Sequence, residues 1–266
     1  MNIEPGEEFL ARLSPYTGTV TEVKPTERGF GTDLTAVVES ERGRFFIKAM
    51  RNRPGGRREQ MLREKLINPF VRQLAPALLW SIEDDEYIVL GFEHVQGRSA
   101  DFLPGSPDLP ATVGLVDRLG RLGVPEPARD WCEDRWDWWA NEGESALFAG
   151  GSLLHTDINP SNILIGRNRA WIVDWSWPTR GAAFIDPALL VAQLVAADHS
   201  PGDAEGWVAG CPAWKNADSR AIDAFVLAYV RMTRVRALRR SSETWLTAMA
   251  DAIDRWAVHR GVATDI

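Results

Sequence analysis

The fold of this chain is decided by the stretch His155-Thr156-Asp157-Ile158-Asn159-Pro160-Ser161-Asn162, which is followed by an apolar run that ends in Asp174. Short apolar segments lie on either side of the turn Gly166-Arg167-Asn168-Arg169. A turn of this length between two apolar segments predicts a β-hairpin. Because the start of one hairpin strand lies near the end of the other, Asn162 and Asp174 are expected to lie close together.

The polar residues of this stretch are those that phosphoryl transfer to an alcohol requires. Asp157 would accept the hydroxyl proton, Asn162 would bind a magnesium ion, and Asp174 would bridge that metal to the phosphates. A plainer interpretation exists for two of them, since Asp157 and Asn162 could be turn residues that bond their own backbone. It fits Asp174 less well, because a carboxylate that ends a buried strand is unfavourable unless it is paired or binds a metal.

Composition and charge restrict the class of protein. The chain has 266 residues, of which 45% are apolar, so it can bury a full core as one large domain or as two lobes. Its net charge of -7 argues against nucleic acid as a partner, because phosphate backbones are bound by lysine-rich and arginine-rich faces. A cationic substrate fits this charge better.

The cysteine content and the amino-terminal sequence indicate in which cellular compartment the protein is expected. The only cysteines, Cys132 and Cys211, are far apart and lack metal-ligand spacing, so neither a disulfide framework nor a zinc site is expected. The amino terminus is acidic rather than apolar, and the chain has no apolar run of about eighteen residues. We therefore expect a cytoplasmic protein without a membrane partner.

The first third of the chain is predicted to form a small antiparallel sheet. Three alternating or β-branched segments carry the pattern, at residues 17–23, 34–39 and 44–49. The turn between the first two contains Gly29 and Gly31, and glycine lets backbone amides approach a phosphate group. Two glycines are also ordinary in a hairpin turn, and this turn lacks the Lys-Ser/Thr ending of a Walker motif.

Lys48 lies in the last of these segments between apolar neighbours, which fits an anchor for nucleotide phosphates. A lysine on a buried strand can instead extend its amine to water. A phosphate anchor needs a carboxylate partner, and the following helix, which Asn68-Pro69 is expected to end, contains Glu59 and Glu64. At about 100° per residue the two glutamates point to different faces, and apolar periodicity does not choose between them.

A further buried strand runs into the extended connector Glu93-His94-Val95, whose main-chain groups could bind adenine. The glycine turn, strand lysine, helix glutamate, connector, catalytic-type stretch and strand-ending Asp174 follow the order of the protein-kinase fold. More narrowly, the sequence resembles the aminoglycoside phosphotransferase family of small-molecule kinases over about residues 17–190. The likeness is strongest at residues 153–164 and at Val173-Asp174-Trp175.

The resemblance implies a two-lobed α+β fold of the protein-kinase type. An antiparallel sheet lobe at residues 1–94 would bind ATP, and a mainly helical lobe at residues 95–266 would hold the catalytic loop and the acceptor. Lys48 would pair with Glu64 rather than Glu59, because the family's glutamate usually lies about this far downstream, and His155 would brace the loop. The implied site residues are catalytic Asp157, nucleotide-binding Lys48, Glu64, Gly29, Gly31, Glu93 and Val95, and the Mg²⁺ ligands Asn162 and Asp174.

The implied activity is transfer of the γ-phosphate of ATP to a hydroxyl group of a small molecule, with an aminoglycoside-like acceptor ranked first. A kinase for another hydroxylated metabolite, of the choline, homoserine or sugar type, would share every motif. A nucleotide-binding pseudokinase is the alternative from another class, although the intact polar set argues against it. A protein kinase ranks last, because Asp174-Trp175-Ser176 replaces Asp-Phe-Gly and no Ala-Pro-Glu follows.

Outside these motifs the chain predicts structural helices. Asp186-Pro187 is typical of a helix start with Asp186 as the cap. Amphipathic helices are expected near residues 219–240 and 243–259, the arginines of the first forming a solvated face. Tryptophans among the acidic residues of segment 130–139 could line a cationic-substrate site. Core packing beside a solvated acidic face is the stronger expectation for them.

Overall fold

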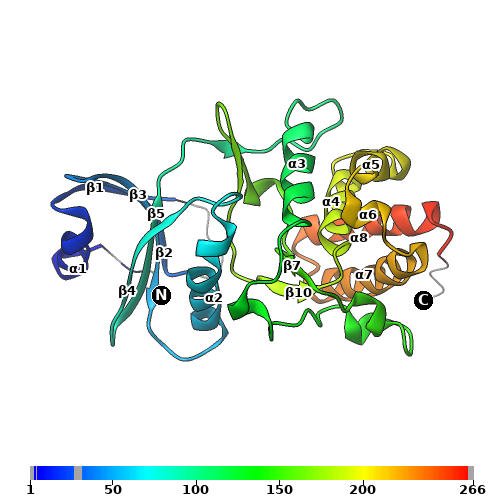
Figure 1. Cartoon of the computed structure of the whole chain (residues 1–266), viewed down its shortest axis with the longest axis horizontal. Coiled ribbons are helices and arrows are strands. Elements are labelled where there is room, and N and C mark those ends of the chain that lie inside the picture. The colour runs from blue at the N-terminus through cyan, green and yellow to red at the C-terminus, as the bar shows by residue number, and fades with distance from the viewer. Residues whose placement is uncertain (1–2, 4, 27–31, 263–266) are drawn as a thin grey trace. The chain divides into compact units, whose positions relative to one another are not determined.

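The computed structural model describes residues 3, 5–26 and 32–262, which form two compact units (Figure 1). The sheet unit comprises Met1–Gln96 with Val173–Trp177, and the helical unit comprises Gly97–Ile172 with Pro178–Ile266. An antiparallel sheet region and a mainly helical region are the α+β arrangement that the sequence predicts. None of the described helices combines the length and the apolarity needed to cross a membrane.

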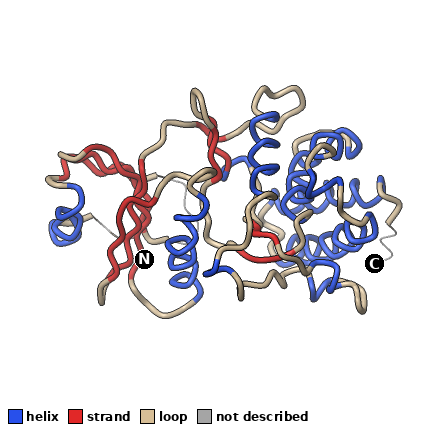
Figure 2. The backbone as a smooth tube through the Cα atoms, in the orientation of Figure 1, coloured by secondary structure: helices blue, strands red, loops and turns tan. Residues whose placement is uncertain are grey.

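The sheet unit is built on a five-stranded antiparallel sheet in the order β1-β2-β3-β5-β4, whose strands are red in Figure 2. Two helices accompany the sheet in this unit. The elements are α1 (Glu7–Thr17), β1 (Val20–Pro25), β2 (Leu34–Ser40), β3 (Gly43–Arg51), α2 (Gly56–Val71), β4 (Leu78–Glu83) and β5 (Tyr87–Glu93).

Strand β3 determines which residues face each side of this sheet. Side chains alternate between the two faces along a strand. Ile47 packs in the core cluster that also holds Phe9 of α1, and Met50 packs in a second cluster with Met61 of α2. Lys48 has the parity of Met50. The pleat of β3 therefore directs the lysine side chain toward α2.

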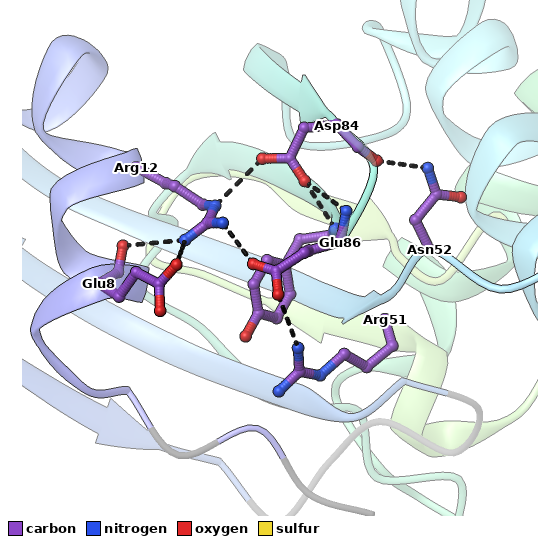
Figure 3. A network of polar contacts seen from close by, with 7 residues as sticks. Glu8, Arg12, Arg51, Asn52, Asp84 and Glu86 are labelled. Carbon is purple, nitrogen blue, oxygen red and sulfur yellow. Dashed lines mark hydrogen bonds and ion pairs between the residues drawn. The ribbon is translucent and has the colours of Figure 1, made fainter.

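Helix α1 is held to the turn between β4 and β5 by the polar network in Figure 3. Arg12 is its centre: Nε donates to Asp84 Oδ2 at 3.1 Å, Nη1 pairs with Glu8 Oε1 at 3.1 Å, and Nη2 pairs with Glu86. Asn52 at the end of β3 donates to the backbone carbonyl of Asp84 at 2.6 Å. The network joins three segments of the sheet unit that are distant in sequence.

The strand predicted at residues 17–23 begins later than expected. Thr17 is the last residue of α1, and β1 begins at Val20. Sequence patterning missed α1 because its apolar face is narrow. Phe9 and Leu13, one turn apart, are its large buried side chains, and the rest of the segment is mostly polar.

The predicted end of α2 at Asn68-Pro69 is also wrong, because the helix continues to Val71. A proline removes one backbone donor and disfavours further turns, but here only a few residues follow it. Val71 is buried, and the Asn68 amide donates to the carbonyl of Pro76 at 2.8 Å and accepts from the Leu78 amide at 2.7 Å. These contacts hold the last turn of α2 in place.

Gly91 of β5 lies directly beneath the indole of Trp80, where an added Cβ would overlap the ring. We expect Gly91→Ala to destabilise the protein by about 1–3 kcal/mol, since the buried indole also stacks on Tyr16 and cannot move away freely. Urea unfolding would measure the change. Gly206→Ala is the matched control, because nothing lies within 4 Å of a Cβ at that helical position.

The helical unit contains two small sheets and a group of helices. Its two-stranded sheet pairs β7 with β10, and its three-stranded sheet has the order β6-β8-β9. The strands are β6 (Arg98–Ser99), β7 (Ser152–Leu154), β8 (Ile163–Ile165), β9 (Ala170–Ile172) and β10 (Thr179–Gly181). The helices are α3 (Leu109–Leu119), η1 (Glu126–Ala128), η2 (Asp137–Trp139), η3 (Ser145–Phe148), η4 (Pro160–Asn162), α4 (Ile185–Ala196), α5 (Pro201–Val208), α6 (Pro212–Lys215), α7 (Ser219–Arg239) and α8 (Thr244–His259).

The hairpin predicted around the turn at residues 166–169 is confirmed. Ile163 of β8 pairs with Ile172 of β9, and the Gly166 amide donates to the carbonyl of Arg169 at 2.9 Å. Helices α7 and α8 also lie close to their predicted positions. Helices α5 and α6, which precede them, were not predicted.

An aromatic cluster around Phe225 of α7 forms one centre of the helical core. Trp136 and Tyr229 lie 4.8 Å and 5.7 Å from its ring centroid, and Phe148 and Phe184 both approach edge-on at 5.8 Å. Aromatic pairs in such tilted and edge-to-face arrangements contribute beyond their buried area. The cluster fixes η2 and η3 against α7.

Candidate functional site

Lys48 in the sheet unit is held between two carboxylates. Its Nζ donates to Glu64 Oε1 at 2.9 Å and Oε2 at 2.8 Å, and to Asp174 Oδ1 at 2.6 Å. Lys48 is only 7% exposed and Glu64 only 3%. The buried amine therefore has a fixed position.

Charge in this cluster favours the ammonium form of the lysine. Burial opposes a positive charge, but Glu64 and Asp174 outweigh it, and the pKa of Lys48 lies well above its ordinary value. The outer member, Asp174, accepts from Lys48 and has a partly exposed side chain. Such a carboxylate suits a divalent cation with oxygen ligands.

The structure chooses between the two candidate glutamates. Glu64 reaches Lys48, whereas Glu59 forms an ion pair with Arg63 on the exposed face of α2 at 2.5 Å. The Trp175 amide also donates to Glu64 Oε1 at 3.3 Å. Glu64 therefore links β3 to the segment that carries Asp174.

Asp174 adopts an unusual backbone conformation, with φ at 63°. Few residues other than glycine occupy this left-handed region, and surrounding contacts must hold them there. The hydroxyl of Ser176 donates to Asp174 Oδ1 at 2.6 Å, on the same oxygen that accepts from Lys48. This contact fixes the carboxylate as well as the backbone.

In the helical unit, the Asp157 carboxylate is exposed but held at both oxygens. Asn159 Nδ2 donates to Oδ1 at 3.0 Å, and Asn162 Nδ2 donates to Oδ2 at 2.8 Å. The Asp157 amide donates to His155 Nδ1 at 3.3 Å. The loop thus presents an oriented carboxylate to solvent.

Asn162 is buried behind this carboxylate. Its amide nitrogen donates both to Asp157 Oδ2 and to the Asp157 carbonyl, at 2.8 Å and 2.9 Å. Because both amide hydrogens are used, the amide oxygen is turned away from Asp157. An amide oxygen and a carboxylate are the kind of donors that Mg²⁺ accepts, together with phosphate oxygens and water. The described residues contain no group of three His, Cys, Asp or Glu that could form a protein-only metal cage.

Asp186 has a more direct part in this loop than the sequence suggested. It does not cap α4, whose N-cap is Phe184, so that prediction was wrong. Its carboxylate instead accepts from the amides of His155 and Thr156, both at 2.8 Å. Thr156 has φ at 67°. Burial raises the pKa of Asp186, and both amide bonds oppose that effect.

Arg135 is a second residue near the loop that motif analysis did not identify. Its guanidinium donates to Glu133 at 2.8 Å and 2.9 Å, and more weakly to the Thr156 carbonyl at 3.5 Å. The Arg135 guanidinium also lies 5.0 Å from the ring of Trp136. No local motif marks these contacts, because they depend on how the segment packs.

The tryptophan-rich segment is only partly core. Trp136 is buried, as predicted, but Trp138 is 87% exposed. The prediction that these tryptophans pack in the core is therefore wrong for Trp138, which lies in η2 at the surface of the helical unit.

The sequence predicts that main-chain groups bind adenine at Glu93 and Val95 and bind phosphate at Gly29 and Gly31. The Glu93 amide already donates to the Ala77 carbonyl at 2.9 Å, so it is not available to a base. Val95 lies beyond β5 and bonds through its main chain to none of the residues that the structure describes. Gly29 and Gly31 lie outside the described residues.

Comparison with known proteins extends these observations. The sequence matches no protein-family model and no curated protein. Solved structures match nearly the whole chain. A thermostable mutant of the aminoglycoside phosphotransferase APH(4)-Ia, in ternary complex with AMP-PNP and hygromycin B, covers 97% of this chain and 100% of its own, with 13% identity and a TM-score of 0.65.

Two further structures show the range of relatives with this architecture. An aminoglycoside phosphotransferase from Alicyclobacillus acidocaldarius covers 98% of this chain and 97% of its own, at 14% identity and a TM-score of 0.64. Choline kinase LicA from Streptococcus pneumoniae covers 95% and 98%, at 10% identity and a TM-score of 0.61. These matches confirm the fold that the sequence resemblance implies.

Proposed function

Because the chain has the fold of the aminoglycoside phosphotransferases and related small-molecule kinases, we propose that it transfers the γ-phosphate of ATP to a hydroxyl group of a small molecule. The observation that carries the proposal is the buried Lys48 ammonium between Glu64 and Asp174. An oriented ammonium with a carboxylate partner is what anchoring of nucleotide phosphates requires.

Within the proposal, residues 1–94 form the nucleotide-binding lobe and residues 95–266 form the catalytic and acceptor-binding lobe. Lys48, positioned by Glu64, orients the phosphates. The main chain near Glu93 and Val95 binds adenine. Because the Glu93 amide is occupied, the carbonyl of that residue and the main chain of Val95 are the groups assigned to the base. We also propose phosphate contacts for the backbone at Gly29 and Gly31, which lie outside the described residues.

Asp157 is the proposed base that orients and deprotonates the acceptor hydroxyl. Its two oxygens are held by Asn159 and Asn162, so the carboxylate can receive a hydroxyl without first reorganising. Most of the rate would come from positioning the reactants and neutralising charge. His155 and Asp186 hold the loop in the required conformation.

Asn162 and Asp174 are the proposed ligands of Mg²⁺. Each offers an oxygen of the chemical type that this metal prefers, and the Asp174 carboxylate is partly exposed. When bound, the metal would neutralise the negative charge of the phosphates. The donor set fits a metal held partly by the substrate, as Mg²⁺ usually is.

The acceptor defines two versions of the proposal. An aminoglycoside-like acceptor follows from the sequence resemblance, and hygromycin B is bound in one structural relative. Another hydroxylated metabolite, of the choline, homoserine or sugar type, follows from a relative that is a choline kinase. Both versions use the same Asp157 chemistry.

The test of the proposed function is a panel of acceptors incubated with the purified protein, ATP and Mg²⁺. Products are detected by the mass of an added phosphoryl group, and the Asp157→Asn variant is the negative control. A product that forms only with intact Asp157 establishes the kinase and its acceptor class. A protein that does not bind ATP with Mg²⁺ would contradict the proposal.

Replacing Glu64 by glutamine separates the role of the two helix glutamates. We expect Glu64→Gln to lower kcat/KM for ATP by about 10- to 100-fold, because Lys48 loses one of its two charged partners and moves from its position. Steady-state kinetics against ATP would measure the effect. Glu59→Gln, which removes only an exposed pair with Arg63, should change kcat/KM less than twofold. Equal losses in both variants would contradict the assignment.

A further inference from the structure

Glu133 is a buried carboxylate in the helical unit that no step of the proposed function uses. It is 6% exposed, and each of its oxygens accepts two hydrogen bonds. Oε1 accepts from the amide and from Nε of Arg135, both at 2.9 Å. Oε2 accepts from Nη2 of Arg135 and from the hydroxyl of Thr179, both at 2.8 Å. Burial favours the neutral acid, but these bonds outweigh it and hold the pKa of Glu133 below its ordinary value.

Glu133 is also joined to the strands that precede the catalytic-type loop. Its amide donates to the carbonyl of Arg180 in β10 at 2.9 Å. Thr179, the preceding residue of β10, is the register partner of Leu154 in β7. Strand β7 ends at Leu154, and the loop begins at His155. The Glu133 carboxylate therefore has a fixed position relative to the start of the loop.

The guanidinium of Arg135 is fixed by Glu133 and reaches the loop with its remaining nitrogen. Nη1 donates to the carbonyl of Thr156 at 3.5 Å. Because the guanidinium is a rigid plane, holding Nε and Nη2 on one carboxylate also determines where Nη1 lies. The group lies 5.0 Å from the ring of Trp136, which is itself buried against Phe225. The bond to Thr156 is long, as hydrogen bonds at catalytic sites often are before the substrates bind.

The Thr156 carbonyl belongs to the peptide group that precedes Asp157. The nitrogen of that same planar group is the Asp157 amide, which donates to His155 Nδ1 at 3.3 Å. Thr156 has φ at 67°, a conformation that surrounding contacts must hold. Asp186 holds the amide of Thr156, and Arg135 holds its carbonyl. A rotation of the peptide would redirect the Asp157 side chain, so its orientation depends on these contacts.

We propose that Arg135, held by Glu133, is a positioning residue that fixes the peptide before Asp157 and thereby the direction of the proposed base. The inference rests on the proposed function, which gives Asp157 that role. Arg135 acts through the loop and is assigned no contact with ATP or the acceptor. Its loss should therefore lower kcat and leave KM for ATP unchanged, because the step that needs an oriented base is slowed.

Arg135→Lys is the decisive variant. Lysine keeps a positive charge beside Glu133, but its single ammonium cannot replace a planar group that serves a carboxylate and a carbonyl together. We expect kcat to fall about tenfold or more, with KM for ATP within about twofold of the wild type. Steady-state kinetics with the acceptor found in the panel would measure both. Arg121→Lys is the matched control, since it alters only an exposed pair with Asp117, and it should leave kcat unchanged.

A double variant separates positioning from folding. Removing Arg135 alone would leave a buried carboxylate without its cation, which destabilises a fold. Glu133→Gln combined with Arg135→Met removes both charges together. This variant should unfold near the wild-type temperature and still have a kcat as low as that of Arg135→Lys. A kcat restored to the wild-type value in the double variant would show that the pair supports only the fold, and would overturn the inference.

Hydrogen exchange tests the hold on the loop without any acceptor. In Arg135→Lys the amides of residues 155–157 should exchange about tenfold faster, while exchange in α7 stays as in the wild type. Unchanged exchange in the loop, or an equal rise throughout the helical unit, would contradict the positioning role. Failure of the proposed function would look different, because the wild-type chain would transfer no phosphate to any acceptor. The exchange rates would still show whether Arg135 holds the loop.

Discussion

Replacing Asp157 by asparagine is expected to lower turnover by about 10²- to 10⁴-fold while leaving nucleotide affinity nearly unchanged. The substitution keeps the shape of the side chain but removes the base that would accept the hydroxyl proton. Asn159 and Asn162 now donate to both carboxylate oxygens, and an amide at position 157 can accept from only one of them. The loop should therefore lose one hydrogen bond, of about 1 kcal/mol.

The measurement combines phosphoryl transfer to an acceptor with calorimetric binding of AMP-PNP. A thermal unfolding curve for Asp157→Asn shows whether the small loss of loop stability affects the fold. Asp157→Glu is the matched variant, because it keeps the charge and displaces the carboxylate by one methylene. We expect both variants to be slow if position and basicity are required together. Turnover of Asp157→Asn within a few-fold of the wild type would refute Asp157 as the base.

Local sequence patterns were sufficient to predict the strands that carry Lys48 and that follow the Asp157 loop. Strand alternation accounts for the direction of Lys48, because the pleat of β3 places it on the side of α2. The apolar segments around residues 166–169 were enough to predict the β8-β9 hairpin. In both cases the local structure is determined by residues that are neighbours in sequence, so the periodicity of apolar residues predicts it.

The choice between Glu59 and Glu64 could not be made from periodicity. Both lie on α2, and which one meets Lys48 depends on how the helix is rotated against the sheet. That rotation is set by packing in the core cluster that holds both Met61 of α2 and Ile88 of β5, which are far apart in the chain. The family spacing favoured Glu64, whereas helix geometry alone left both candidates open.

Residues that act through long-range packing were missed for a similar reason. Asp186 resembles an ordinary helix cap in sequence, yet it bonds to amides some thirty residues earlier in the chain. The arginines of α7 resemble one solvated face. In the structure, however, Arg231 donates to Asn141 and Arg234 pairs with Asp254. Partners of charged side chains are a property of the packed structure, so a single sequence does not reveal them.

Replacing Asp174 by asparagine is expected to abolish the effect of Mg²⁺ on nucleotide affinity and to lower turnover by about 10²- to 10³-fold. Asparagine tolerates the left-handed backbone found at this position, where φ is 63°. The variant therefore removes a negative charge and keeps the backbone. Lys48 retains Glu64 as a partner, so its anchor should persist.

The measurement is AMP-PNP binding with and without Mg²⁺, in the wild type and in Asp174→Asn. The wild type should bind more tightly with the metal, whereas the variant should show the same affinity in both conditions. Asp198→Asn is the matched control, because Asp198 is exposed, has φ at 70° and belongs to no part of the candidate site. If Mg²⁺ still strengthened binding in Asp174→Asn, the metal would have to be held by other oxygens.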